Sequence, residues 1–291
     1  MKLTQLSLRD FNLAETLDSG QVFHWEDRGD GYLGTIGPNA AYVEQRGNRL
    51  SFAGVTAEVI RNYFALDHPL ADIRRSFPDD PALQSASEYC EGLRIIRQPL
   101  WECLATFITS SMKQVAHIRQ ISKTLRQRFG KPVRLLDFEV SSYPTAARLA
   151  ELDEAALRRC ALGYRAKHLL ATARLIASGE IDLDRWSSLS DNDLRERLCQ
   201  LPGVGVKIAN CVMLFAYERL RAFPIDVWIE RVLKREYFPG KRKVTPGQLR
   251  AFCEKYFGEH GGYAQQYLFH HARKGGTGRK IVKSGRNGAT G

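Results

Sequence analysis

Hydrophobic and polar residues follow two different patterns along this chain. From Gln21 to Gly54, short apolar runs are separated by turn-forming clusters rich in Gly, Asn and Asp, as is typical of strands joined by tight turns. After Thr56, which can cap a helix, apolar residues recur at helical spacing over most of the remaining chain. The first pattern predicts an antiparallel sheet with strands at residues 22–26, 31–36, 40–45 and 49–52.

The helical pattern is divided by proline, serine and glycine. A long run at residues 86–130 is broken at Pro99 and again at Ser110 and Ser111, and further helices are predicted near 164–179, 245–258 and 261–274. We therefore expect an α+β protein with a β-rich N-terminal antiparallel sheet domain followed by a mostly α-helical body that has room for two helical subdomains. The predicted domains are residues 1–85, the sheet domain; 86–272, the helical body; and 273–291, a C-terminal tail.

The C-terminal segment carries much of the net charge of the chain. The chain of 291 residues has a formal net charge of +11 and a pI near 9.5, which indicates a polyanionic partner. Six basic residues lie between Arg273 and the end of the chain, where the sequence is rich in glycine and holds no acidic or aromatic residue. Such a composition predicts a disordered basic tail. Without these six charges the net charge falls from +11 to +5, which fits a DNA-facing surface without requiring one.

The cysteines argue against a metal centre. The chain has six of them without a C-x-x-C pair or a tight cluster, which disfavours a zinc site and a four-cysteine iron–sulfur cluster. No apolar run near the start is long enough for a signal peptide, and no later run could span a membrane. We therefore expect an intracellular monomer with reduced thiols, no metal and no organic cofactor.

The most informative stretch is CQLPGVGVKIANC, at residues 199–211. Its glycines, Gly203 and Gly205, permit a tight turn between two helices, which makes this a helix-hairpin-helix pattern. Backbone N–H groups at the start of the second helix, from Val206 onward, form a site for a phosphate group. Such hairpins hold the DNA backbone without reading its sequence, so the motif alone predicts DNA binding but not catalysis.

Two ionisable residues extend this prediction to chemistry. Lys207 stands in the first turn of the second helix, where the positive end of the helix dipole disfavours an ammonium ion and favours the neutral, nucleophilic amine. Asp226 can begin the next helix, where its carboxylate accepts backbone N–H bonds. An amine beside a carboxylate suits attack on a sugar C1′, because the carboxylate stabilises positive charge on the ring. The plainer alternative is that Lys207 only pairs with a phosphate and Asp226 only caps its helix.

LPGVGVKIANC followed by PIDV resembles the helix-hairpin-helix DNA glycosylases, and within them the 8-oxoguanine DNA glycosylases. The resemblance covers about residues 17–273. It implies that the partner is double-stranded DNA containing oxidised guanine. It also implies that Lys207 displaces the damaged base and forms a Schiff base with the sugar, that β-elimination can then cut the strand, and that Asp226 assists.

The same resemblance assigns a lesion pocket. The segment SGQVFHW, at residues 19–25, matches a stretch of the family in which a glycine, here Gly20, turns its carbonyl toward N7 of the lesion. Oxidised guanine carries a hydrogen at N7, whereas guanine presents an acceptor there. Gln265 and Phe269, one helical turn apart, match the residues that bond the Watson–Crick edge and stack on the base, and Cys211 matches the opposite wall.

Further matches concern the DNA around the lesion. Tyr164 and Arg165, in the stretch GYRA, match residues that press against the base stack and contact the orphaned base. Where eukaryotic members usually have an asparagine cluster and an arginine, this chain has Met112 and His117, so we expect a weaker preference for cytosine opposite the lesion. Trp228 lies where eukaryotic members often have a histidine that contacts a phosphate.

Two other functions remain open on the sequence. An alkylpurine DNA glycosylase of the same fold would lack the lysine and would use water with the aspartate. A non-catalytic helix-hairpin-helix protein that recognises DNA structure would bind DNA in a salt-sensitive way and release no base.

Overall fold

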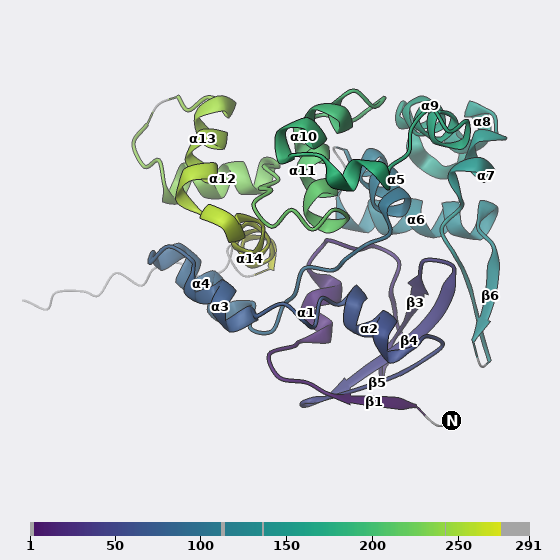
Figure 1. Cartoon of the computed structure of the whole chain (residues 1–291), viewed down its shortest axis with the longest axis horizontal. Helices are drawn as coiled ribbons and strands as arrows, with labels where there is room; N and C mark the ends of the chain where they lie inside the picture. Colours follow the sequence, from purple (N-terminus) through teal and green to yellow (C-terminus); the bar gives the residue numbers. More distant parts are fainter. Residues whose placement is uncertain (1–2, 112–113, 136, 242, 275–291) are drawn as a thin grey trace, which may run out of the picture.

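The computed structural model describes residues 3–111, 114–135, 137–241 and 243–274. Its N-terminal part folds as an antiparallel sheet (Figure 1). Within those residues the strands lie in the order β1-β5-β4-β3-β2. Their bounds are β1 Thr4–Ser7, β2 Glu26–Asp27, β3 Tyr32–Ile36, β4 Asn39–Arg46 and β5 Arg49–Ala53. Gly37 and Gly47 have φ values of +58° and +56°, and these turns set the pairing of β3 with β4 and of β4 with β5.

The predicted sheet is confirmed, with two differences at its edges. The strand predicted at residues 22–26 is reduced to Glu26–Asp27, because Val22 and Phe23 are consecutive and both buried. Val22 joins the core of the sheet and Phe23 the core of the helical body, so the segment connects the two instead of alternating as a strand. The edge strand β1 was not predicted, because its mostly exposed residues carry no hydrophobic alternation.

Two short helices, α1 (Leu13–Asp18) and α2 (Ala57–Tyr63), accompany the sheet (Figure 1). Leu50 and Phe52 of β5 pack with Ile60 of α2 in a core that is separate from that of the helical body. Thr56 caps α2 as predicted, since its side-chain oxygen accepts a hydrogen bond of 3.3 Å from the backbone N–H of Val59.

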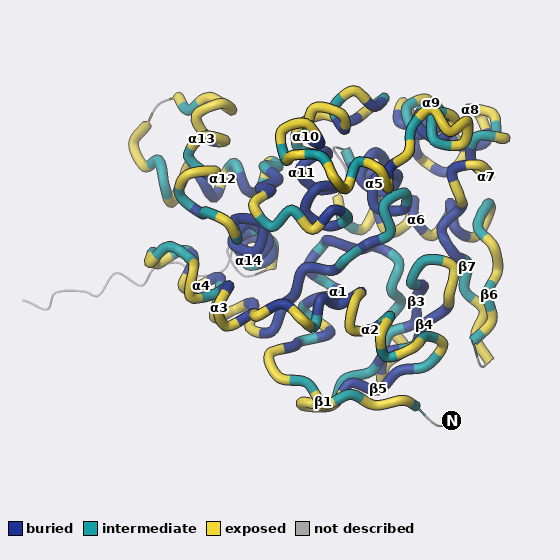
Figure 2. The backbone as a smooth tube through the Cα atoms, in the orientation of Figure 1, coloured by how far each residue is buried: buried dark blue, intermediate teal, exposed yellow. Residues whose placement is uncertain are grey.

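The helical body is built around α5, whose residues from Glu102 to Ser110 are all buried. It packs against α6, α9 and α11, and Figure 2 shows α5 and α14 among the most deeply buried segments. The predicted breaks are confirmed, because α5 begins after Pro99 and ends at Ser110. The helices that follow α2 are α3 Leu70–Arg75, α4 Pro81–Tyr89, α5 Leu100–Ser110, α6 Val115–Phe129, α7 Ala146–Ala150, α8 Glu154–Leu157, α9 Arg165–Ala177, α10 Asp191–Cys199, α11 Val206–Phe215, α12 Val227–Glu236, α13 Pro246–Tyr256 and α14 Gly261–Lys274.

A β-hairpin, β6 (Pro132–Leu135) with β7 (Phe138–Ser141), follows α6 and was not predicted. It lies against β3 and β4, so a later part of the chain returns to the N-terminal sheet. Arg126 of α6 reinforces this junction from a buried position, where it pairs with the Glu102 carboxylate and donates a hydrogen bond of 2.7 Å to Oγ1 of Thr35. The hairpin strands are short and at most half-buried, which leaves no hydrophobic pattern to predict them.

The last helix, α14, includes Arg273 and Lys274, so it extends two residues past the predicted start of the tail. Residues 275–291 lie outside the described part of the chain. None of the helices in the described ranges has the length and apolar character needed to cross a membrane.

A polar cluster fastens α14 to the sheet domain. His68 is hydrogen-bonded through Nδ1 to the Tyr263 hydroxyl of α14 at 2.7 Å, and through Nε2 to the Glu218 carboxylate at 2.6 Å. Arg97 also pairs with Glu218. The hydrogen bond from His68, with a further contribution from Arg97, holds the pKa of the Glu218 carboxyl at about 2. The cluster therefore connects the α2–α3 loop, the α11–α12 connection and α14.

Replacing Glu218 with glutamine tests the contribution of this cluster to stability. Because the pKa of the folded carboxyl, about 2, lies below the ordinary value of 4.5, the carboxylate stabilises the fold above that value and loses its contribution as the pH falls toward 2. We expect Glu218→Gln to lower the melting temperature at neutral pH, by a margin that shrinks as the pH falls from about 5 to about 3. Glu180→Gln, at an exposed residue, is the control. A margin that stays constant over this range would contradict the assignment.

Candidate active site

The helix-hairpin-helix motif consists of α10, the turn at residues 200–205 and α11. Gly203 has a φ of +81°, and a Cβ added there would lie 2.7 Å from Cβ of His168 on α9, so both conformation and space require glycine. Gly205 is the N-cap of α11, with nothing within 4 Å of an added Cβ. Because this cap has no side chain, the first N–H groups of α11 are available to an anion.

Lys207 lies half-buried in the first turn of α11. Its Nζ is 5.4 Å from the centroid of the Phe107 ring, which belongs to α5. Phe107 is held in turn by stacking on Phe215, with the ring centroids 5.6 Å apart. Among the described residues, the amino group of Lys207 has this aromatic neighbour but no carboxylate partner within ion-pair distance.

Asp226 is the N-cap of α12, as its place in the sequence predicts. Its Oδ1 accepts hydrogen bonds from the backbone N–H groups of Trp228, at 3.0 Å, and Ile229, at 2.9 Å. Both bonds use the same carboxylate oxygen, and no residue in the described part of the chain donates to Oδ2. The capping role therefore leaves one oxygen of this carboxylate available for chemistry.

The thiol of Cys211 connects these two groups. Cys211 lies one turn after Lys207 and is 3% exposed. Burial raises the pKa of the Cys211 thiol; the nearby ammonium of Lys207 opposes this rise and the carboxylate of Asp226 adds to it. Lys207 and Asp226 therefore influence the same buried thiol, with opposite sign.

The turn at Gly20 follows α1 and lies against α14. Gly20 has a φ of +88°, and a Cβ added there would lie 3.0 Å from Cε1 of Phe269. The carbonyl of Ser19 accepts a hydrogen bond of 2.9 Å from Nε2 of Gln266. Gln21 fixes the other side of the turn, since its side-chain amide donates to the carbonyls of Thr16 and Arg94. The structure thus brings Gly20 and Phe269 together from opposite ends of the chain.

Gln265 stands one turn before Phe269 on α14. It is only 4% exposed, and its Oε1 is buried without a hydrogen-bond partner among the described residues. Leaving a buried acceptor unpaired costs about 1–3 kcal/mol, and few such groups persist in folded proteins. The amide oxygen of Gln265, one turn before Phe269, is therefore an acceptor that no described residue uses.

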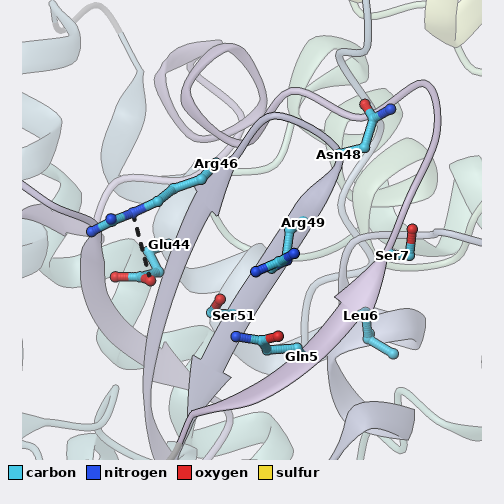
Figure 3. Close-up of a pocket in the computed structure, with 8 residues that line it drawn as sticks. All are labelled: Gln5, Leu6, Ser7, Glu44, Arg46, Asn48, Arg49 and Ser51. Atoms are coloured by element: carbon cyan, nitrogen blue, oxygen red, sulfur yellow. Dashed lines mark ion pairs between the residues drawn. The ribbon is translucent and has the colours of Figure 1, made fainter.

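Two hollows of the surface lie apart from the Gly20 turn. One of about 600 Å³, drawn in Figure 3, is lined by residues of β1, β4 and β5 and the turn between them, among them Arg46 and Arg49, and by none of the predicted site residues. Another, of about 130 Å³, lies beside Lys207 and is lined by residues of α11, α12, α13 and the residue Ile225. The described chain holds no group of three or more His, Cys, Asp or Glu side chains that could bind a metal ion.

Comparison with known proteins decides the family. Residues 4–104 match the profile described as 8-oxoguanine DNA glycosylase, N-terminal domain, and residues 105–259 match the HhH-GPD superfamily base excision DNA repair protein. The chain belongs to the 8-oxoguanine DNA glycosylase family.

Individual relatives agree with this assignment. The chain is 31% identical to the N-glycosylase/DNA lyase OGG1 of Arabidopsis thaliana, over 92% of its own length and 78% of that protein. The structure of MBOgg1 in complex with a low-affinity DNA ligand has a TM-score of 0.89 at 32% identity, covering 95% of this chain and all of that one. The 8-oxoguanine glycosylase/lyase of Clostridium acetobutylicum, in complex with double-stranded DNA containing cytosine opposite 8-oxoguanine, has a TM-score of 0.87 at 30% identity, covering 94% of this chain and 98% of that one. The chain is thus a DNA glycosylase of base excision repair.

Most residues expected to contact DNA in an 8-oxoguanine DNA glycosylase lie exposed at the starts of helices. Tyr164 directly precedes α9 and is 48% exposed, and Val206 begins α11 and is 38% exposed. His117 is exposed in the first turn of α6, and Trp228 is half-buried in the first turn of α12. Met112 lies outside the described residues.

Arg165 takes a more buried position than these residues. It is 6% exposed and donates hydrogen bonds to the carbonyl groups of Leu162 and Ser111. Its guanidinium also lies 4.4 Å from the centroid of the Tyr164 ring. In this structure Arg165 therefore supports Tyr164 and the end of α5, and a contact with an orphaned base would require it to leave these carbonyl groups.

Three residues of the site were not found by sequence analysis. Phe107 lies beneath the amino group of Lys207, while Gln266 and Arg273 bind the turn that contains Gly20. For Arg273 the available signal was its position four residues after Phe269, which places both on one face of a helix. Phe107 and Gln266 carry no sequence signal that separates them from ordinary core residues.

Two glycine substitutions test the hairpin. Gly203→Ala forces a side chain into a positive φ and against His168, so we expect a loss of about 1–3 kcal/mol in the free energy of unfolding. Gly205→Ser is the matched variant, because its side chain enters open space and serine caps helices well, so stability should be kept or raised. The serine hydroxyl would also occupy an N–H group otherwise offered to a phosphate. We therefore expect weaker duplex DNA binding at fixed salt, and unchanged affinity would argue against a phosphate site at α11.

Proposed function

We propose that this DNA glycosylase flips 8-oxoguanine out of duplex DNA and excises it through a Schiff base on Lys207, followed by strand nicking through β-elimination. The observation that carries the proposal is the placement of Lys207 in the first turn of α11 and of Asp226 at the N-cap of α12, with Cys211 one turn after the lysine and its thiol influenced by both charges. The Gly20 turn and α14 add a wall that can recognise a base. The proposed chemistry requires no metal and no organic cofactor.

In the proposed reaction, the neutral amine of Lys207 attacks C1′ while the C1′–N9 bond breaks, and the purine leaves with the bonding electrons and takes up a proton. The carboxylate of Asp226 stabilises the positive charge that develops on the sugar. Opening of the sugar ring then gives a protonated imine between Nζ and C1′. Loss of a proton from C2′ expels the 3′ phosphate, and hydrolysis of the imine releases the lysine.

The proposed recognition of the lesion uses three kinds of contact. The Gly20 carbonyl accepts a hydrogen bond from N7–H, which oxidised guanine has and guanine lacks. Oε1 of Gln265, buried and unpaired, suits the N–H groups on the Watson–Crick edge of a guanine-derived base. Phe269 stacks on the base and Cys211 forms the opposite wall, in keeping with the burial of the thiol.

The proposed DNA contacts surround this pocket. N–H groups of α11 after Gly205 hold a backbone phosphate, and the exposed ring of Tyr164 supports the stack beside the extruded base. Trp228 offers an indole N–H to a phosphate. With Met112 and His117 in place of an asparagine and an arginine, discrimination for cytosine opposite the lesion is weaker than with a forked arginine.

Borohydride trapping tests the covalent step directly. With duplex DNA containing 8-oxoguanine, the wild-type chain should give a stable cross-linked complex, because borohydride reduces the imine between Nζ and C1′. Lys207→Gln should abolish both the cross-link and base release while leaving duplex binding nearly unchanged. Base release without any trapped complex would instead indicate a water-using enzyme of the alkylpurine type.

Two substitutions at Asp226 separate capping from chemistry. Asparagine caps a helix about as well as aspartate, so Asp226→Asn should keep the melting temperature while removing the charge. We expect the rate of base release to fall by about 10²–10³-fold, as for the loss of one preorganised electrostatic contact. Asp226→Ala should show the same kinetic loss and also about 1 kcal/mol less stability. Wild-type rates in Asp226→Asn would restrict this residue to a capping role.

A further inference from the structure

A stripe of three residues runs along one face of α14. Gln265, Phe269 and Arg273 follow one another at intervals of four residues, so their side chains lie on neighbouring turns of the same side. Gln265 and Phe269 belong to the proposed lesion pocket, whereas nothing so far gives Arg273 a role in recognition.

The guanidinium of Arg273 lies at the junction of α14 with the Gly20 turn. Its Nη2 donates a hydrogen bond to the backbone carbonyl of Asp18. Its Cζ lies 3.7 Å from the position of a Cβ added at Gly20 and 5.8 Å from the centroid of the Phe269 ring. One cation is therefore in reach of both the turn that carries the Gly20 carbonyl and the ring that faces it.

The guanidinium of Arg273 is only partly paired in this position. The Nε atom is buried without a hydrogen-bond partner among the described residues. Burial also lowers the pKa of Arg273, although the carboxylate of Asp18 opposes this. The same stripe thus holds two unpaired buried polar atoms, Nε of Arg273 and Oε1 of Gln265, on either side of Phe269.

We propose that Arg273 is a positioning residue for lesion recognition, which clamps the Gly20 turn to α14 and so fixes the Gly20 carbonyl at one distance from the ring of Phe269. The inference rests on the proposed excision of oxidised guanine. A turn that is free to move would still admit the base, but the N7–H group would meet the carbonyl in fewer of the bound complexes. A clamp of this kind affects steps that involve the base and leaves later steps on the empty sugar unchanged.

Lys274 provides a matched comparison on the same turn. It pairs with the side-chain carboxylate of Asp18, which is also bound by Arg119 at 2.7 Å, and the side chains of Lys274 and Arg119 are 43% and 44% exposed. Exposed ion pairs of this kind contribute little to holding a backbone in place. Arg273 instead donates a hydrogen bond to the backbone carbonyl of Asp18, and Gln266 donates one to the carbonyl of the next residue, Ser19.

The experiment compares the full-length chain with its variants on two substrates. The first is a duplex with 8-oxoguanine opposite cytosine, on which base release is measured. The second is the same duplex with a preformed abasic site, on which strand nicking is measured. For Arg273→Leu we expect kcat/KM for base release to fall by about 10²-fold, which is the size of effect that a misplaced contact can have. Nicking of the abasic site should stay within about twofold of wild type. Arg273→Lys should recover part of the loss, because an ammonium can reach the Asp18 carbonyl but has no planar fork. Lys274→Leu should match wild type on both substrates.

Each other outcome overturns the inference. Equal losses on both substrates would make Arg273 a residue of general stability, and unchanged base release would remove it from recognition. If Lys274→Leu lost as much base release as Arg273→Leu, the effect would come from the loss of one positive charge and not from the position of Arg273. Failure of the proposed function is distinguished from these results, because the wild-type chain itself would then neither release 8-oxoguanine nor be trapped by borohydride.

Discussion

The start of α11 is the constraint on which the rest of the site depends. It presents N–H groups without a side-chain cap and carries a lysine in its first turn, and both features are unfavourable for an isolated helix. The remainder of α11 compensates, because every residue from Ile208 to Phe215 is buried in the core of the helical body. Phe107 supports the amine from α5, and α12 begins with a carboxylate that is also a good cap. The unfavourable helix start is thus supported by packing elsewhere.

Ionic and polar contacts join the two cores of the molecule. Arg126 with Glu102 links α5, α6 and the sheet, and His68 with Glu218 and Tyr263 links the sheet domain to α14. Buried ion pairs add little net stability, since desolvation offsets their attraction. They do require defined partners, however, and so they favour one orientation of the sheet domain on the helical body. That orientation in turn carries the Gly20 turn to α14.

Sequence alone predicted the parts of the structure that have local signals. Strands β3, β4 and β5 are separated by glycine turns. Helices α2 and α12 begin directly after their caps, Thr56 and Asp226, and α5 lies between Pro99 and Ser111. Strand β1 and the β6–β7 hairpin were missed because they are little buried and are defined by their partners. In the site, Lys207 and Asp226 could be named from a motif. The ring of Phe107, the inward position of Arg165 and the contacts of Arg273 depend on packing between distant segments, which no local pattern reports.

The proposed base-recognition wall draws Gly20 from the turn after the first helix of the chain, α1, and Phe269 from the last helix, α14; both helices are labelled in Figure 1. Lys207 and Asp226, by contrast, lie within a single stretch of 20 residues at the starts of α11 and α12, and this stretch precedes α14 in the chain. During translation the residues of the proposed reactive pair are therefore synthesised before Phe269, which belongs to the wall that would select the substrate. Under the proposed function, the selecting wall is complete only when the final helix has packed against the beginning of the chain.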